Sequence, residues 1–351
     1  MWFPTNLLTN KSVFFVVIYC LCAMAVAEES NKKKESNNRY IPLHAQGNMW
    51  IFDYQFSRQM MSGTLKGSDG IATEDALQNQ DYKRNPSYVN AVGCTTGSES
   101  ACLLSHIGSK MTMNVHSFSA QYNQTAGLRW KAKFNYLSNS QTMFQKTSAN
   151  AQVGTFEVGS SGIGDIQLLM INRVKQTKWF DIDLTIGFSF PLGSIDAKDG
   201  QIEEFAPFEM QTGSGTYDVI TEVAVAGIYR RYEYGFSVNR VQRTGVNIQN
   251  YNQGDILTID LWGQYTFPFG TQVRTGVEQN VRAPVQGRDV RTSYNPEYTG
   301  GKRMDLVFGA AQKYNDFLVY FDYKFPVLQF VNGVQLKTSG TMVMGLQYKF
   351  K

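Results

Sequence analysis

Histidines that could serve as a catalytic base are few in this chain, because it contains only three. A hydrolytic site needs such a base within hydrogen-bonding reach of its nucleophile. His44 lies in a polar stretch near the N-terminus, and His106 lies in a long segment that we expect to be a loop. His116 and Ser117 are neighbours in an extended segment, so their side chains point in opposite directions. We therefore predict no catalytic residues, no enzymatic activity and no cofactor.

Two further residue combinations are relevant to metal binding and to cross-linking. Met111, Met113 and His116 carry atoms that can bind a metal, but methionines at alternate positions are more typical of packing, so we predict no metal site. Cys94 and Cys102 lie in the polar stretch "GCTTGSESAC". In an exported chain this pair is expected to form a disulfide, which would stabilise its short loop by roughly 2.5 kcal/mol.

Charged residues are the largest set with a chemical role, and they recur at alternate positions of extended segments. In "WFDIDLTIGFSF", Asp181 and Asp183 alternate with large apolar residues. Successive side chains of a strand point to opposite faces, so one face is apolar and the other is polar. The same assignment along the chain predicts a polar face that carries Asp53, Arg129, Lys131, Lys133, Asp165, Arg173, Asp181, Asp183, Asp218, Glu222, Arg230, Asp260, Arg274, Glu278, Arg282, Asp305, Asp322 and Lys324.

The elements that must position these charges are strands with a period of two. Each segment has about ten residues or more, the length that a tilted strand needs to cross a bilayer. Their apolar faces would contact lipid, whereas a charge on that face would cost up to several kcal/mol. We predict twelve strands, near residues 48–57, 111–123, 128–142, 165–175, 179–192, 217–230, 233–243, 256–267, 271–283, 303–313, 317–327 and 339–350.

The connections between these strands alternate in length. One set is short ("NQTAG", "QTK", "RY", "PFG" and "YND"), and the other is long, with about fifty residues after the first strand. Outer-membrane barrels have short periplasmic turns and longer extracellular loops. The sequence therefore predicts an all-β fold over residues 47–351: a single closed antiparallel transmembrane barrel of about twelve strands. Ten or fourteen strands are the alternatives, because the predicted first extracellular loop, residues 58–109, has room for a hairpin.

The N-terminal residues predict export. Lys11 precedes an apolar run of about 16 residues that ends in Ala-Val-Ala at position 27, which fits a signal peptide over residues 1–27. The alternative, a helical membrane anchor, needs about 20 apolar residues. Residues 28–46 are charged and are expected to form a flexible tail. Together with the barrel pattern, this places the protein in the outer membrane of a Gram-negative bacterium.

The last predicted strand alternates as a barrel strand should. Gly345, Tyr348 and Phe350 resemble the C-terminal assembly signal of outer-membrane barrels, although Val343 and Lys351 depart from that pattern. The resemblance implies the barrel assembly machinery as a partner, and the apolar face implies outer-membrane lipid.

A longer resemblance covers roughly residues 110 to 350. "SSGIGDIQLLMINRV" and "WFDIDLTIGFSFPLGSID" resemble the outer-membrane transporter family of the meta-pathway phenol-degradation type, which has a Gly-x-Gly-Asp strand entry and a strand ending in Pro-x-Gly-Ser. The matching residues are Gly162, Gly164, Asp165, Pro191, Gly193 and Ser194. Where the family usually has Pro-Thr-Gly, this chain has Pro-Leu-Gly. The resemblance implies a barrel that takes up or exports small molecules.

A channel for small solutes, including organic or aromatic ones, is the leading functional hypothesis. The net charge is +4, and residues of both charges are scattered along the chain. The sequence therefore has no basic patch that would indicate nucleic-acid binding. Two alternatives are a structural or surface-interaction barrel whose interior is filled by ion pairs and, less favoured, a membrane-embedded hydrolase. The candidate lumen and selectivity residues are Asp165, Asp181, Asp183, Asp218, Glu222, Arg230, Asp260, Arg274, Glu278, Arg282 and Asp305.

Three of these carboxylates follow glycine and open strands on the long-loop side. They define a hypothetical charged ring at the extracellular mouth, formed by Asp165, Asp218 and Asp305 with Arg243, Arg282, Arg288 and Arg303. The alternative is that Gly and Asp precede strands for local backbone reasons.

Overall fold

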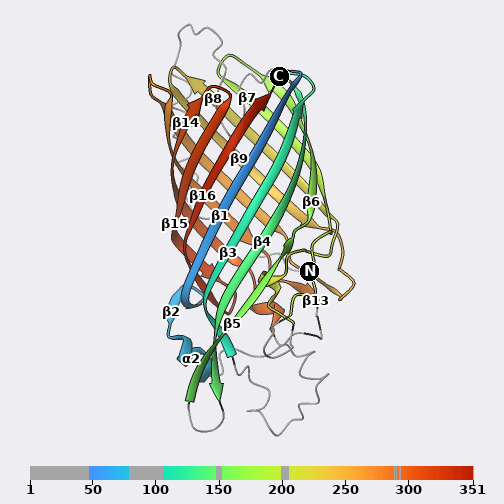
Figure 1. Ribbon diagram of the computed structural model, residues 1–351, viewed down its shortest axis with the longest axis vertical. Coiled ribbons are helices and arrows are strands. Elements are labelled where there is room, and N and C mark those ends of the chain that lie inside the picture. Colours follow the sequence, from blue (N-terminus) through green and yellow to red (C-terminus); the bar gives the residue numbers. More distant parts are fainter. Residues whose placement is uncertain are drawn as a thin grey trace, which may run out of the picture. The chain divides into compact units, whose positions relative to one another are not determined.

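Twelve antiparallel strands form a closed barrel in the computed structural model, which describes residues 47–78, 106–147, 152–198, 205–287, 289, 291 and 294–350. This confirms the predicted fold class and strand number (Figure 1). Within these ranges, no helix is long and apolar enough to cross a membrane. The barrel strands are β1 (Met49–Lys66), β3 (His106–Asn123), β4 (Leu128–Thr147), β6 (Ile166–Gln176), β7 (Phe180–Phe190), β8 (Asp218–Tyr229), β9 (Tyr232–Arg243), β11 (Ile256–Thr266), β12 (Thr271–Arg282), β14 (Gly301–Tyr314), β15 (Phe317–Val331) and β16 (Val334–Phe350).

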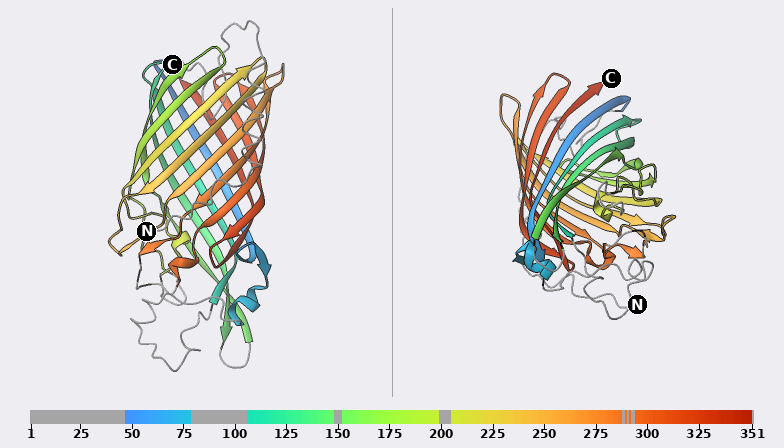
Figure 2. Two further views of the ribbon diagram at one scale, coloured as in Figure 1. Left: turned by 180° about the vertical axis from the view of Figure 1, so that it is seen from behind. Right: turned by 60° about the horizontal axis from the view of Figure 1, so that its bottom comes forward.

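The barrel closes where β16 pairs with β1. Their antiparallel register runs from Trp50 opposite Phe350 to Lys66 opposite Val334, with irregularities near Met61. In Figure 2 the tilted strands follow one another round the barrel without a gap between β16 and β1. This pairing removes the free sheet edge, which a membrane does not tolerate because lipid cannot satisfy backbone hydrogen bonds.

The strands alternate between an exposed outer face and an enclosed inner face. In β7, Asp181 and Asp183 are buried inside, whereas Ile186 and Phe188 are more than half exposed outside. The predicted facing of this strand is therefore correct. Aromatic pairs on neighbouring strands lie on the outer face near the short turns: Trp50 with Tyr122, Tyr232 with Tyr265, and Phe317 with Tyr348. Such a girdle is typical of the lipid–water interface.

The two ends of the barrel differ as predicted in most of their connections. At the short-turn end (top in Figure 1), residues 124–127, 177–179, 230–231, 267–270 and 315–316 join the strands. At the long-loop end (bottom in Figure 1) the connections are longer, with one exception. β15 and β16 are joined there by Asn332 and Gly333 alone, where we expected a loop of about ten residues.

Strand lengths explain this exception. β15 and β16 extend past the predicted boundaries, and so do β1 and β3, which shortens the expected first loop. The first loop also contains β2 (Asp69–Ile71) and α2 (Thr73–Gln78). Lys337 is exposed on this extension of β16. Beyond the apolar band a strand needs no apolar outer face, so the pairing continues after the hydrophobic pattern has ended.

A further strand, β5 (Gln152–Ile163), was not predicted. It pairs with the far half of β4, whereas β6 pairs with the near half. β5 and β6 therefore act as one long strand interrupted at Gly164 and Asp165. The sequence of β5 is rich in glycine and serine and lacks large apolar residues at regular spacing, so no period indicated it. Two short strands, β10 (Tyr251–Asn252) and β13 (Gln286–Gly287), pair with each other separately.

A segment of the β7–β8 connection, residues 205–216, packs against the interior of the long-loop end; we call it the inward loop. It contains the 3₁₀-helix η3 (Phe208–Met210), and a second one, η4 (Pro296–Tyr298), lies in the β12–β14 connection. Phe208 and Met210 are almost fully buried against Met111 of β3 and Tyr251 of β10. The carbonyl oxygen of Met210 accepts a hydrogen bond of 2.5 Å from Ser160 Oγ on β5. The largest apolar core thus lies at this end of the barrel.

Cysteine labelling of β7 tests the facing. We expect Ile186→Cys to react with a membrane-soluble maleimide in vesicles, and Thr185→Cys to react only with small water-soluble reagents, because neighbouring residues face opposite sides. Reaction of Thr185→Cys from the lipid phase would place the register one residue away and invert every facing in that strand.

Candidate functional site

The two larger cavities that the described residues line inside the barrel lie at different levels along the strands. The outer cavity, toward the long-loop end, measures about 330 Å³, and the inner cavity, toward the short-turn end, measures about 260 Å³. Along β1, Gln59 and Met61 line the outer cavity, whereas Asp53 and Gln55 line the inner one. The two cavities are therefore stacked along the barrel.

Side chains of both charges line the inner cavity, together with Leu169, Ile171, Trp262 and Tyr320. The Tyr320 hydroxyl donates to the Asp53 carboxylate at 3.2 Å, and the Asn239 amide donates to Glu222 at 3.3 Å. The charged residues of the lining are Asp53, Arg129, Lys131, Asp183, Glu222, Asp260 and Lys349.

A buried ion network lies beside the inner cavity near the short turns. Arg129 Nη2 contacts Asp183 Oδ2 at 2.5 Å, and Arg173 Nε contacts Asp183 Oδ1 at 2.9 Å. Arg173 Nη1 also contacts Asp181 Oδ2 at 2.8 Å. All four side chains are at most 4% exposed. Two arginines and two aspartates on β4, β6 and β7 thus neutralise one another within the wall.

A second cluster on β11, β12 and β15 is centred on Arg274. Its guanidinium contacts Asp260 at 2.8 Å and Asp322 at 3.6 Å, and it lies 5.8 Å from the centre of the Trp262 ring. The Trp262 ring fits against Gly235, where an added Cβ atom would come within 2.3 Å of it. Trp262 points inward with Asp260 and Gln264 because alternate residues of β11 share a face, and the small Gly235 leaves room for its ring.

Ion pairs separate the two cavities. Lys324 lies on β15 between Tyr320, which lines the inner cavity, and Gln329, which lines the outer one. Its Nζ contacts Glu278 Oε2 at 2.6 Å. On the neighbouring β14, Arg303 Nε donates to Asp305 Oδ2 at 2.9 Å. The Glu278–Lys324 pair therefore lies at a level between the two cavities, and Arg303 borders the outer one.

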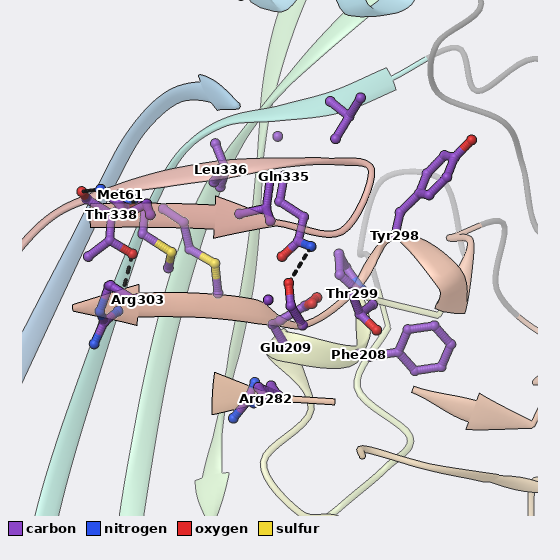
Figure 3. A pocket seen from close by; sticks show the side chains of 18 of the residues that line it. Met61, Phe208, Glu209, Arg282, Tyr298, Thr299, Arg303, Gln335, Leu336 and Thr338 are labelled. Carbon is purple, nitrogen blue, oxygen red and sulfur yellow. Dashed lines mark hydrogen bonds between the residues drawn. The ribbon is translucent and has the colours of Figure 1, made fainter. Parts of the chain in front are cut away.

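The outer cavity has an apolar side and a charged side. Met61, Met111 and Met113 line it from β1 and β3, while Arg282 and Arg303 line it from β12 and β14. Figure 3 shows the side chains of Arg282 and Arg303 with that of Glu209, which enters from the inward loop.

Glu209 is the carboxylate of this cavity. Burial raises the pKa of the Glu209 carboxyl above its ordinary value, although its own backbone N–H and the positive charge of Arg282 oppose the shift. The neutral form of Glu209 is therefore populated at a higher pH than in an ordinary glutamate.

Two of the predicted lumen residues lie away from both cavities. Arg230 lies in the two-residue β8–β9 turn, exposed and with a φ of 57°, and its guanidinium covers the Tyr229 ring at 5.3 Å. Asp165 lines neither cavity. Its carboxylate accepts hydrogen bonds from the backbone N–H of Gly193 at 3.0 Å and of Ser214 at 2.9 Å. Asp165 therefore joins the strand break to the β7–β8 connection, a local backbone role.

The residues of the hypothetical charged ring at the mouth form separate local contacts. Asp218 pairs with Arg243, and Asp305 pairs with Arg303. Asp165 accepts from backbone and serine donors, as described above. Arg288, like Cys94 and Cys102, lies outside the described residues. In the part of the chain that the structure describes, no group of three or more His, Cys, Asp or Glu side chains is arranged to hold a metal ion.

Seven of the remaining predicted residues lie on the inner face of their strands, in the contacts given above: Asp181, Asp183, Asp218, Asp260, Arg274, Glu278 and Asp305. Glu222 and Arg282 line the inner and the outer cavity. The prediction missed Glu209 and Trp262. Phe208 and Met210 flank Glu209 in an otherwise polar connection, and that apolar pair was the available signal for an inward loop.

Among the comparisons with known proteins, one solved structure supports the fold. No family model and no curated protein matches the sequence. An outer membrane channel from Pseudomonas putida F1 has a similar structure, with a TM-score of 0.57 at 12% identity over 92% of this chain and 100% of that one. A FadL homologue of Pseudomonas aeruginosa gives a TM-score of 0.37 at 11% identity, over 86% and 90% of the two chains. The toluene transporter TbuX of Ralstonia pickettii gives 0.41 at 12% identity, over 88% and 90%.

A matched pair of arginine substitutions tests the buried network. Arg173→Gln should lower the free energy of unfolding by about 3–5 kcal/mol, because it leaves two buried aspartates without their shared counter-ion. Arg240→Gln removes an exposed ion pair with Asp255 and should cost about 0–1 kcal/mol. Urea titration of the refolded proteins, followed by tryptophan fluorescence, measures both. Equal small losses would contradict a structural role for the network.

Proposed function

We propose that the protein is a channel in the outer membrane of a Gram-negative bacterium, and that small organic solutes pass through its interior. The observation that carries the proposal is the pair of stacked cavities, both lined partly by polar and charged side chains. A barrel of this size lies between small barrels filled by side chains and large open porins. A narrow, selective pathway requires cavities inside a barrel of this intermediate size.

The lining residues suggest how solutes would be selected. Charged groups on the inner faces set the local field of a pore, and their spacing limits what passes. The inner cavity presents Asp183, Glu222 and Asp260 beside Arg129 and Lys131. We therefore propose as selectivity residues those that face a cavity, and we leave out Asp165 and Arg230, which line neither cavity.

The Glu278–Lys324 pair is the proposed barrier. It lies between the cavities and spans β12 and β15, and its side chains keep some exposure, 16% and 23%. The buried Arg129–Asp183 pair is held by additional contacts with Arg173. Opening a passage at the Glu278–Lys324 pair breaks fewer interactions than opening it at the buried network.

The outer face of the barrel indicates the environment of the protein. Its exposed apolar and aromatic residues suit outer-membrane lipid, with the short turns on the periplasmic side. We also propose that β16, through Gly345, Tyr348 and Phe350, is the strand that the barrel assembly machinery recognises. The outward-facing Phe350 is half exposed, which leaves it available for such a contact.

One observation favours a second function, a non-conducting structural or surface-interaction barrel. Most inward-facing charges are already paired with one another, which is what a filled interior would show. No observation in the described residues favours a membrane-embedded hydrolase. His116 lies on the outer face, where Tyr54 Oη is 2.9 Å from its Nδ1, so it does not approach either cavity.

Single-channel recording in planar bilayers tests the proposal. The double variant Glu278→Gln/Lys324→Gln removes both charges of the barrier and leaves neither unpaired, so it should increase the conductance or the open time of the wild-type steps. Arg240→Gln, on the outer surface, should leave them unchanged. Complete silence of the wild type and of the double variant, with both folded by their heat-dependent gel migration, would favour the non-conducting barrel.

A further inference from the structure

We propose that the outer cavity binds a small organic anion with an apolar body, such as a single-ring carboxylate or sulfonate, whose anionic group pairs with Arg282. Glu209 is then an internal competitor for that position. This inference rests on the proposed channel function, because it names the class of solute that the pathway takes.

The unusual state of Arg282 is the first support. Among the described residues, Arg282 is the inward-facing arginine whose guanidinium has no carboxylate oxygen within 4.0 Å and no hydrogen-bond partner. An enclosed charge without a partner is costly, so an anion that enters the cavity gains a ready counter-ion. The other inward arginines each contact a carboxylate: Arg129 with Asp183, Arg173 with Asp181, Arg243 with Asp218, Arg274 with Asp260, and Arg303 with Asp305.

The charge balance of the two cavities is the second support. The outer cavity is lined by the inward-facing cations Arg282 and Arg303 against one carboxylate, Glu209, whereas the charge of Lys302 lies on the exposed face of β14. The lining of the inner cavity carries three cations against four carboxylates. A cavity lined mainly by one sign of charge concentrates ligands of the opposite sign. Anions are therefore favoured in the outer cavity and not in the inner one.

The opposite wall supplies an apolar surface. Met61 and Met111 are opposite each other in the β1–β3 register, and Met113 follows on the same face. Methionine side chains adapt to irregular shapes and make favourable contacts with aromatic rings. A volume of about 330 Å³ lies at the small end of the usual range for ligand pockets, roughly 300–1,000 Å³. A solute with one ring and one anionic group fits these dimensions and this division of polarity.

Glu209 lies beside the position of the proposed anion. It projects from the inward loop into the outer cavity, close to Arg282 (Figure 3). The two groups interact electrostatically, yet they form no ion pair within 4.0 Å. Phe208 and Met210 on either side of Glu209 are buried and fix the loop. Glu209 therefore reduces the positive potential at Arg282 without neutralising it by direct contact.

Other titratable or charged groups surround Glu209. Tyr294, Tyr298, Arg282 and Arg303 are in the cavity lining; behind it, Tyr251 packs on Phe208, and burial raises the pKa of Tyr251 to about 12. The His106 ring packs edge-on against Tyr294 at 5.9 Å, and a histidine ordinarily titrates between about pH 5.5 and pH 7.5. A Glu209 variant distinguishes the two contributions.

Calorimetric titration of the full-length folded protein in detergent tests the site. Benzenesulfonate, which stays ionised over this pH range, should bind more tightly than the neutral benzenesulfonamide of nearly the same shape. Arg282→Gln should weaken benzenesulfonate by roughly ten- to a hundred-fold, the usual weight of a hydrogen bond to a charged group. Arg282→Lys, which keeps the charge, should weaken it less, and Arg240→Gln on the outer surface should have no effect.

The pH dependence tests the role of Glu209. Lowering the pH shifts a carboxyl with a raised pKa toward its neutral form, so benzenesulfonate should bind more tightly at about pH 5.5 than at about pH 7.5. Glu209→Gln should strengthen binding at pH 7.5 and remove this dependence. If the pH dependence of binding persists in Glu209→Gln, it comes from His106, and the role of Glu209 as a competitor is overturned.

Equal affinity for the sulfonate and the sulfonamide, or unchanged binding in both Arg282 variants, would overturn the anion site. Calorimetry does not require conduction, so it separates the two proposals. Anion binding that depends on Arg282 in a protein silent in bilayers would keep the site and contradict the channel. A conducting protein without anion preference would contradict the site alone.

Discussion

Inside a membrane no water can hydrogen-bond to a backbone amide, so every strand must be paired along both edges. Pairing of β16 with β1 meets that requirement here, and the remaining architecture depends on it. Closure gives each strand one face toward lipid and one toward the interior. Charges such as Asp183 and Arg274 are excluded from lipid by their desolvation cost and must be accommodated inside. The interior chemistry is thus a consequence of the closed wall.

Once enclosed, the charges neutralise one another wherever the geometry allows. Near the short turns the two arginines and two aspartates around Asp183 form a compact network. Toward the long-loop end the inward loop takes up space that strands alone leave open, and it brings Glu209 near Arg282 without contact. Among the residues that the structure describes, five inward arginines pair with aspartates and one has space before it, so the potential is uneven along the barrel axis. We attribute the proposed preference for anions to that unevenness.

Prediction from the sequence was accurate for the strand segments that cross the bilayer and less accurate outside it. Where lipid requires an apolar outer face, as in β7, the alternation determined both the strand and the inward position of Asp181. Beyond the apolar band the requirement ends, and the extension of β16 and the Gly- and Ser-rich β5 were missed although backbone pairing continues. Arg230 was misplaced because a two-residue turn has no period to follow. The inward position of Glu209 was not predicted, because the position of a loop inside a barrel depends on tertiary packing. Only the flanking Phe208 and Met210 indicated burial.

The most direct test of a solute pathway through this interior is the current through a single folded molecule with benzenesulfonate added on the long-loop side. If solutes traverse the two cavities and pause at Arg282, the current should show brief interruptions whose frequency rises with benzenesulfonate concentration, and Arg282→Gln should shorten or abolish them. A steady current that benzenesulfonate never interrupts, in a protein that folds and conducts, would contradict the account.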